Sequence, residues 1–299
     1  MPLRDLESII AGFRAMQSGW GEGTTPAEMR ADFEEWCERF PDDREASITR
    51  VSAGGVPADQ IEVAGVATSR VVLYLHGGGY SLGSARAYRG LGKRIAFAAR
   101  ARVVIPDYRL APEHVFPAAV EDAVASYRWL LAKGVEPQQI AVGGDSAGGG
   151  LALALLVSLR DAGAPLPACA VLLSPFADLE CRGESYTARA ELDPIVSREM
   201  GLGMGKAYVG DREPSDPLAS PVNAALAGLP PLLIQVGSRE VVLDDARRIE
   251  RHAREAGVLA KLDVWPGMVH VWHLFASALA EGQRAIEDLG SFIERWAKG

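Results

Sequence analysis

Residues 139–150 read QIAVGGDSAGGG, and this stretch decides the fold. A run of apolar, β-rich residues enters the pentapeptide GDSAG at 144–148, and the helix-forming segment GGLALALLVSLR follows it. A G-x-S-x-G pentapeptide between a strand and a helix forms a tight turn that holds its serine hydroxyl exposed at the edge of a sheet. The glycines at 144 and 148 let neighbouring backbone pass without a clash against Cβ. The pattern predicts that Ser146 is a nucleophile.

A glycine-rich turn of this kind can also cradle a phosphate group. That alternative requires a G-K-[ST] sequence, or a G-x-G-x-x-G sequence with a later acidic partner, and the chain has neither. We therefore favour the nucleophile.

Other apolar runs of strand length alternate with segments of helical period on both sides of this turn. The predicted strands are 70–76, 102–106, 139–143, 169–174, 231–236 and 260–265. The predicted helices lie near 3–17, 26–39, 85–100, 117–133, 146–162, 240–257 and 275–297. Continuous apolar strands that alternate with helices are typical of a parallel sheet covered on both faces. Segments 47–53 and 60–66 are predicted to pair as an antiparallel hairpin at one edge.

The alternation fails once, at residues 178–225, which are too long for an ordinary crossover and contain a helix-like piece near 197–208. Insertions of this size are more often functional lids than structureless loops. We expect residues 1–45 and 178–225 to form one helical cap. Residues 46–177 and 226–299 would then form the catalytic core.

A second glycine-rich segment, HGGGY at 76–80, ends the strand VVLYL. In serine hydrolases an H-G-G-G loop donates backbone N–H groups to the oxyanion, together with the N–H of the residue after the nucleophile. Such fixed donors are usually the largest catalytic contribution. The expected donors are Gly78, Gly79 and Ala147, and Tyr80 is expected to contact substrate.

The base that activates Ser146 should be a histidine late in the chain. Enzymes with this strand-to-helix turn, the nucleophile elbow, have their catalytic residues in the order serine, acid, histidine. His270 comes after the last predicted strand and the turn WPGM. His252 lies within an arginine-rich helical segment, and His273 falls within the next helix. The sequence predicts His270 as the base.

The acid should follow the preceding strand, PLLIQVG, and Glu240 is the first carboxylate after it. Asp244 and Asp245 lie where the next helix begins, and acidic residues suit the helix dipole there. The acid only orients the histidine and stabilises the imidazolium, so glutamate can replace aspartate. We predict Glu240, with Asp244 as the alternative.

Composition limits the class of partner. Lys and Arg number 31 against 39 Asp and Glu, which gives a formal net charge of −8. An acidic chain without a basic block is a poor candidate for nucleic acid or an anionic membrane. The three cysteines form no C-x-x-C pair, and MPLRDLESIIAGF has no long apolar region. We expect a soluble, cytoplasmic protein without nucleic acid or stable membrane partners.

Further motifs accompany the elbow and the HGGGY loop. They are DYRLAPEH at 107–114, FPA at 116–118, Asp216-Pro217 and Ser220-Pro221. Together these motifs resemble the bacterial hormone-sensitive-lipase-like carboxylesterases, family IV of the bacterial lipolytic enzymes, over roughly residues 46–297. The resemblance implies an α/β-hydrolase fold, in which an eight-stranded, mostly parallel sheet is flanked by helices and covered by a helical cap. It also implies the roles predicted above for Ser146 and His270 and for the oxyanion hole.

The chain departs from the family at the acid, where the usual Asp-Pro-Leu reads Glu240-Val241-Val242. Some members use glutamate, so the class of enzyme is unaffected. Arg109 and Glu113 of the DYRLAPEH motif are expected to form an ion-pair network that braces the oxyanion loop.

The implied activity is that of a serine carboxylesterase that cleaves short- to medium-chain acyl esters through an acyl-enzyme, without cofactor or metal. The same triad could cleave an amide or arylformamide. A small-molecule receptor is a second alternative, since the similar gibberellin receptors lack the histidine, but His270 argues against it. Met200 and Met204 are expected to contact substrate. The edge strand near 260–265 is expected to form a homodimer, as in the resembled family.

Overall fold

A central sheet of eight strands organises the chain, and the computed structural model describes residues 5–65 and 69–299. The strand order is β1-β2-β4-β3-β5-β6-β7-β8. The antiparallel strands are β1 (Ala46–Ala53) and β2 (Val56–Val63). The parallel strands are β3 (Val71–Leu75), β4 (Arg102–Pro106), β5 (Ile140–Asp145), β6 (Cys169–Leu173), β7 (Leu232–Gly237) and β8 (Ala260–Trp265). The predicted α/β class and the eight-stranded, mostly parallel sheet are confirmed.

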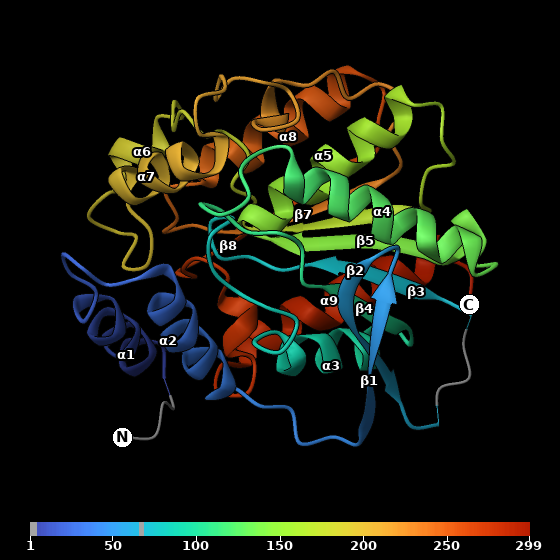
Figure 1. Ribbon diagram of the computed structural model, residues 1–299, viewed down its shortest axis with the longest axis horizontal. Helices are drawn as coiled ribbons and strands as arrows, with labels where there is room; N and C mark the ends of the chain where they lie inside the picture. The colour runs from blue at the N-terminus through green and yellow to red at the C-terminus, as the bar shows by residue number, and fades with distance from the viewer. Residues whose placement is uncertain (1–4, 66–68) are drawn as a thin grey trace.

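Helices cover both faces of this sheet, as continuous apolar strands require. One face carries α4 (Ala118–Ala132), α5 (Ala147–Asp161) and α8 (Leu243–Glu255), and the other carries α3 (Arg89–Ala98) and α9 (Ala280–Trp296) (Figure 1). Every residue of β3, β5, β6 and β7 is buried. The carboxyl ends of these strands therefore meet at a rigid edge.

The remaining helices gather beyond this edge. They are α1 (Leu6–Ser18), α2 (Pro26–Glu38), α6 (Ser185–Ala188) and α7 (Arg198–Val209). Figure 1 shows α1 and α2 on the same side of the molecule as α6 and α7, although about 150 residues separate the two pairs in sequence. The described part of the chain also contains three short 3-10 helices, at Pro137–Gln139, Pro221–Asn223 and Trp272–Phe275.

Several predicted boundaries differ from the structure. The second strand of the hairpin ends at Val63, and helix α8 begins at Leu243 because the residues before it form a loop. Helix α9 begins at Ala280, after the 3-10 turn at Trp272–Phe275. Residues 3 and 4 of the predicted first helix and residue 66 of the predicted hairpin lie outside the described residues.

Arg109 and Glu113 both form ion pairs, as expected, but with different partners. Arg109 binds Asp122 of α4, with Nη2 2.8 Å from Oδ1. Glu113 instead accepts from Arg30 of α2 at 2.6 Å. The two residues brace separate parts of the fold, because each motif residue finds its partner on a different helix.

Within the described ranges, no helix combines the length and apolar character that a membrane span needs.

Candidate active site

Ser146 lies in a sharp turn between β5 and α5, in a backbone conformation that side chains rarely adopt. Its φ is +52° and its ψ is −121°. The flanking glycines are required by close packing, since a Cβ at Gly144 would lie 2.2 Å from the Gly148 carbonyl oxygen. A Cβ at Gly148 would lie 2.0 Å from the carbonyl oxygen of Leu75. The turn therefore holds the Ser146 hydroxyl at the carboxyl edge of the sheet, at the N-terminus of α5.

The structure brings Ser146, His270 and Glu240 together. His270 Nε2 is 2.8 Å from Ser146 Oγ, and His270 Nδ1 is 2.9 Å from Glu240 Oε2. Glu240 follows β7 and His270 follows β8, so neighbouring parallel strands bring both residues to the serine. These distances are those of a serine–histidine–acid hydrogen-bonded chain.

The other two late histidines lie elsewhere. His252 Nδ1 is 3.1 Å from the Val222 carbonyl oxygen. His273 is fully buried, with Nε2 3.0 Å from Gln235 Oε1, and burial lowers its pKa to about 3. Neither ring contacts Ser146.

Glu240 is completely buried and all its polar contacts are made inside the protein. Its Oε1 accepts hydrogen bonds from Ser174 Oγ at 2.8 Å and from the backbone N–H of Gly237. Burial raises the pKa of Glu240. Burial also opposes the charged form of His270, but the hydrogen bond and charge of Glu240 outweigh it and raise the pKa of His270. The acid thus stabilises the imidazolium.

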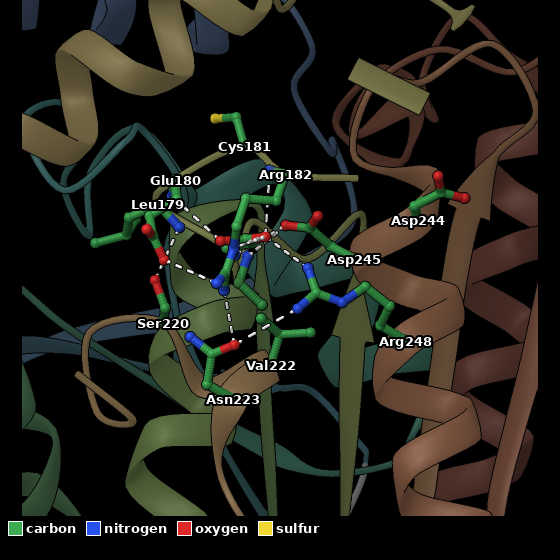
Figure 2. Close-up of polar contacts among 12 residues, drawn as sticks. Leu179, Glu180, Cys181, Arg182, Ser220, Val222, Asn223, Asp244, Asp245 and Arg248 are labelled. Carbon is green, nitrogen blue, oxygen red and sulfur yellow. Dashed lines mark hydrogen bonds and ion pairs between the residues drawn. The ribbon is translucent and has the colours of Figure 1, made fainter. Parts of the chain in front are cut away.

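Asp244, the alternative acid, points toward residues 178–225, which we call the insertion. It accepts from the Ser185 backbone N–H at 2.8 Å and from Arg247 at 3.1 Å. Figure 2 shows Asp244 apart from the polar cluster formed by Asp245 and Arg248 and by residues at the base of the insertion. The structure therefore brings Glu240, and not Asp244, to His270.

Two of the three expected oxyanion donors line the cavity that contains Ser146, and the third is its neighbour in sequence. Gly78 (φ +111°) and Gly79 (φ +60°) line the same cavity as Ser146. Ala147 is the first residue of α5, where backbone N–H groups have no partner within the helix. The Gly78 carbonyl accepts from the Leu82 N–H at 2.8 Å, which closes the glycine loop into a tight turn.

Asp145, the residue before the nucleophile, has a structural role that sequence reasoning did not assign. Its carboxylate accepts from the hydroxyls of Tyr74 at 2.9 Å and Tyr88 at 2.8 Å, and from the Gly77 N–H at 3.1 Å. Burial raises its pKa to about 6. Asp145 thereby ties the nucleophile elbow to the glycine loop. The motif contains this residue, but its partners become visible only in three dimensions.

A mostly apolar cavity of about 80 Å³ opens above Ser146. Helices α1 and α2 and the turn between them contribute four aromatic residues, Phe13, Trp20, Phe33 and Trp36. The insertion contributes Ile195, Val196, Met200, Gly201 and Met204. The expected positions of Met200 and Met204 at the cavity are thus observed. Sequence reasoning missed the aromatic wall, although Phe33 and Trp36 have the three-residue spacing of a single helix face.

Tyr80 does not line this cavity, contrary to expectation. It is 1% exposed, and its ring stacks on Tyr208 of α7 with 3.7 Å between centroids. Its side chain is directed into the core, because Tyr80 itself has a φ of +61° after the glycine turn.

Over residues 5–65 and 69–299, no three His, Cys, Asp or Glu side chains are grouped closely enough to hold a metal ion.

Comparisons with known proteins agree with this geometry. A family model described as alpha/beta hydrolase fold matches residues 72–274. The chain is 48% identical over 249 residues to an acetyl-hydrolase of Streptomyces hygroscopicus, covering 80% of this chain and 83% of that protein. It is 33% identical over 268 residues to an esterase of Acinetobacter venetianus, covering 89% and 88%.

Solved structures extend the likeness to almost the whole chain. A crystal structure of an esterase from the bacterial hormone-sensitive lipase family has a TM-score of 0.94 at 48% identity, covering 97% of both chains. A structure of EstE5 soaked by p-nitrophenyl butyrate has a TM-score of 0.88 at 41% identity, covering 96% of this chain and 97% of that one. The predicted resemblance is confirmed: this chain belongs to the alpha/beta hydrolase family, among its bacterial hormone-sensitive-lipase-like esterases.

Proposed function

We propose that this protein is a serine carboxylesterase whose catalytic residues are Ser146, His270 and Glu240. The observation that carries the proposal is the hydrogen-bonded chain of these three side chains, with spacings of 2.8 and 2.9 Å, at the floor of an apolar cavity. The relatives named esterase and acetyl-hydrolase support the same class of reaction.

The mechanism follows from the roles of the three groups. Ser146 Oγ attacks the ester carbonyl while His270 Nε2 takes its proton. The negative charge that forms on the carbonyl oxygen is stabilised by the backbone N–H groups of Gly78, Gly79 and Ala147. His270 then gives its proton to the departing alcohol, which leaves the acyl group on Ser146. A water molecule, activated by His270, then attacks the acyl group in the same two steps and releases the carboxylic acid product.

The cavity favours uncharged esters with short to medium acyl chains. Its walls are apolar and aromatic, and each methylene that enters adds up to about 0.8 kcal/mol of binding free energy. The gain stops when the small, cap-covered space is full, so we infer an optimum at about four to eight acyl carbons. The p-nitrophenyl butyrate used with EstE5 falls within this range.

The direct test combines a substrate series with a covalent probe. Turnover is measured on p-nitrophenyl esters of increasing acyl length, beside one matched anilide and one arylformamide. We expect ester turnover with a short- to medium-chain optimum. An optimum on long-chain triglyceride emulsions would contradict the proposed substrate class, and faster cleavage of the anilide or the arylformamide would indicate an amide hydrolase.

We also infer a homodimer formed through β8, in the cytoplasm. β8 ends the sheet, and Val264 on it and Leu259 beside it are 39% and 53% exposed. Unprotected edge strands offer unpaired backbone groups to a second copy.

A further inference from the structure

The loop that carries the acid is fastened to the cap. We call residues Gly237–Val242 the acid loop. Four hydrogen bonds join it to the insertion: Arg189 Nη1 to Ser238 O at 2.6 Å, Arg239 Nε to Leu192 O at 2.9 Å, Val241 N to Asp193 Oδ2 at 2.9 Å, and Ser185 Oγ to Val241 O. The insertion therefore holds the acid loop on both sides of Glu240.

Asp193 differs from the other three contacts because it brings a negatively charged group to the acid loop. Its side chain is 7% exposed, and its Oδ2 accepts the N–H of the peptide next to Glu240. Its Oδ1 accepts the backbone N–H groups of Ile195 at 3.0 Å and Val196 at 3.1 Å. Ile195 and Val196 line the cavity. One carboxylate thus connects a wall of the cavity to the acid loop.

The negative charge of Asp193 is not neutralised by an ion pair with the cations near it in the described residues. The nearby cations are Arg14 of α1, Arg189 after α6 and Arg239 of the acid loop, and each donates to a backbone carbonyl oxygen, of Pro194, Ser238 and Leu192 respectively. Within the described residues, none of these three guanidinium groups forms an ion pair with Asp193. Arg239 instead lies 3.9 Å from Glu7.

Burial lowers the pKa of His270, but the negative charges of Glu240, Asp193 and Asp145 raise it. Glu240 touches the ring directly and Asp145 precedes the nucleophile. His273, which lies nearby on the next 3-10 helix, is kept neutral by burial. Asp193 is therefore the one member of this anionic group that comes from the cap.

We propose, resting on the function proposed above, that Asp193 is a positioning residue for hydrolysis. It fixes the Glu240–Val241 peptide so that Glu240 reaches His270, and it adds a negative charge that stabilises the imidazolium formed in each step. Because Asp193 also holds Ile195 and Val196, an acyl chain that contacts this wall acts on the same carboxylate that positions the acid.

Replacing Asp193 by asparagine separates charge from shape. The Asp193→Asn side chain keeps an oxygen for one of the two sets of N–H donors and removes the charge. The test measures kcat/KM on p-nitrophenyl butyrate as a function of pH. A nearby anion favours the protonated imidazole, so removing the charge of Asp193 should move the acid limb of this pH profile to lower pH by about 0.5–1. We also expect kcat to fall by about 10-fold, with a smaller change in KM.

Asp244→Asn is the matched control. Asp244 also joins the start of α8 to the insertion, through the Ser185 N–H, but it does not contact the acid loop peptide next to Glu240. We expect its acid limb and kcat to match those of the wild type. A structural role alone would lower the melting temperature of Asp193→Asn without moving the pH profile.

Two results overturn the inference: an Asp193→Asn acid limb that superimposes on the wild type, or an equal displacement in Asp244→Asn. Labelling of Ser146 by an organophosphate distinguishes this failure from failure of the proposed function. A wild-type protein that hydrolyses esters and is labelled at Ser146 keeps the function even when Asp193 proves silent. A wild-type protein that neither hydrolyses esters nor is labelled at Ser146 would refute both the proposed function and the inference about Asp193.

Discussion

At the scale of single residues, Glu240 shows what a longer acid requires. Its carboxylate accepts hydrogen bonds from Ser174 and Gly237 on one side and contacts His270 on the other. The glutamate side chain, which is one methylene longer than that of aspartate, therefore fits inside a buried site. Both oxygens of Glu240 are hydrogen-bonded. A carboxylate in this position fixes the tautomer that has Nδ1 protonated and Nε2 free to accept from Ser146.

Glu240→Gln should lower kcat by about 10⁴-fold while the fold is kept, because an amide N–H directed at Nδ1 favours the wrong imidazole tautomer. The kcat of Glu240→Asp should lie between those of Glu240→Gln and the wild type, because the shorter carboxylate reaches His270 only if the loop moves. Steady-state kinetics on p-nitrophenyl butyrate measures both. A greater loss in Asp244→Asn than in Glu240→Gln would show that the acid is misassigned.

The sequence predicted which residues meet at the site, but it did not predict what holds them. Ser146, His270 and Glu240 each follow a predicted strand, and parallel strands bring their carboxyl ends to one edge. Asp145 and Asp193 act through partners 68 and 48 residues away in sequence. Such pairings depend on the packing of residues 178–225 and of the glycine loop, which local patterns do not specify.

At the scale of elements, Arg30 ties α2 to the segment that follows the HGGGY motif. Arg30 donates to the carbonyl oxygens of Ser81 at 2.8 Å and Ala111 at 2.9 Å, and it binds Glu113 with both terminal nitrogens. The hydrogen bond from Arg30 lowers the pKa of Glu113 to about 2. Arg30 therefore joins α2 to the loop that follows Gly79.

Arg30→Met should reduce the free energy of unfolding by about 1–3 kcal/mol, because two backbone carbonyls lose their donor. The value of kcat should fall as well, since the turn after Gly79 loses its support. Urea unfolding and turnover measure the two effects. Arg254→Met, which removes an exposed helical ion pair with Glu250, is the control and should change stability by less than about 0.5 kcal/mol. Equal effects in the two variants would refute this role for Arg30.

The start of α8 is tied to the base of the insertion by a second buried carboxylate, Asp245. Its Oδ2 accepts from the backbone N–H groups of Ala177 at 2.9 Å and Asp178 at 3.0 Å, and from the Tyr186 hydroxyl at 3.2 Å. Figure 2 shows Asp245 on the side of the cluster where Arg248 of α8 approaches Arg182 and Asn223. Burial raises the pKa of Asp245 to about 7.

A raised pKa in the folded state makes stability fall as pH rises. Between the ordinary aspartate pKa and about 7, the folded protein keeps a proton on Asp245 that the unfolded chain has lost, so the free energy of unfolding decreases until pH passes about 7. Asp245→Asn keeps an acceptor and cannot ionise. From pH 5 to pH 8 the wild type should lose about 2–3 kcal/mol more than this variant in urea unfolding. Parallel pH profiles would contradict the assignment.

At the scale of elements, the sequence also predicted the order and type of nearly all strands and helices, because the strands are continuous apolar runs and the helices keep their 3.6-residue period. It placed the ends less well. The structure shows why at Glu240, where residues 240–242 were predicted to begin the helix but lie in a loop that is hydrogen-bonded to the insertion. Long-range contacts outweighed local propensity there.

At the scale of the whole molecule, β8 is an exposed end of the sheet. The side chains of Lys261 and Asp263 bind one another at 2.8 Å, so their charges protect the edge only weakly, and Val264 remains 39% exposed. Light scattering at micromolar concentration should give about 64 kDa, twice the chain mass of 31.9 kDa. Val264→Lys should return the mass to that of one chain. A wild-type mass near 32 kDa would rule out the dimer.

The central claim is that Ser146 carries the acyl group. Wild-type protein treated with an organophosphate such as diethyl p-nitrophenyl phosphate should take up one equivalent, and peptide mass spectrometry should place it on Ser146. Ser146→Ala should take up none and should lose about 10⁶-fold in kcat on p-nitrophenyl butyrate. Label on another residue, or turnover near the wild-type value in Ser146→Ala, would contradict the account.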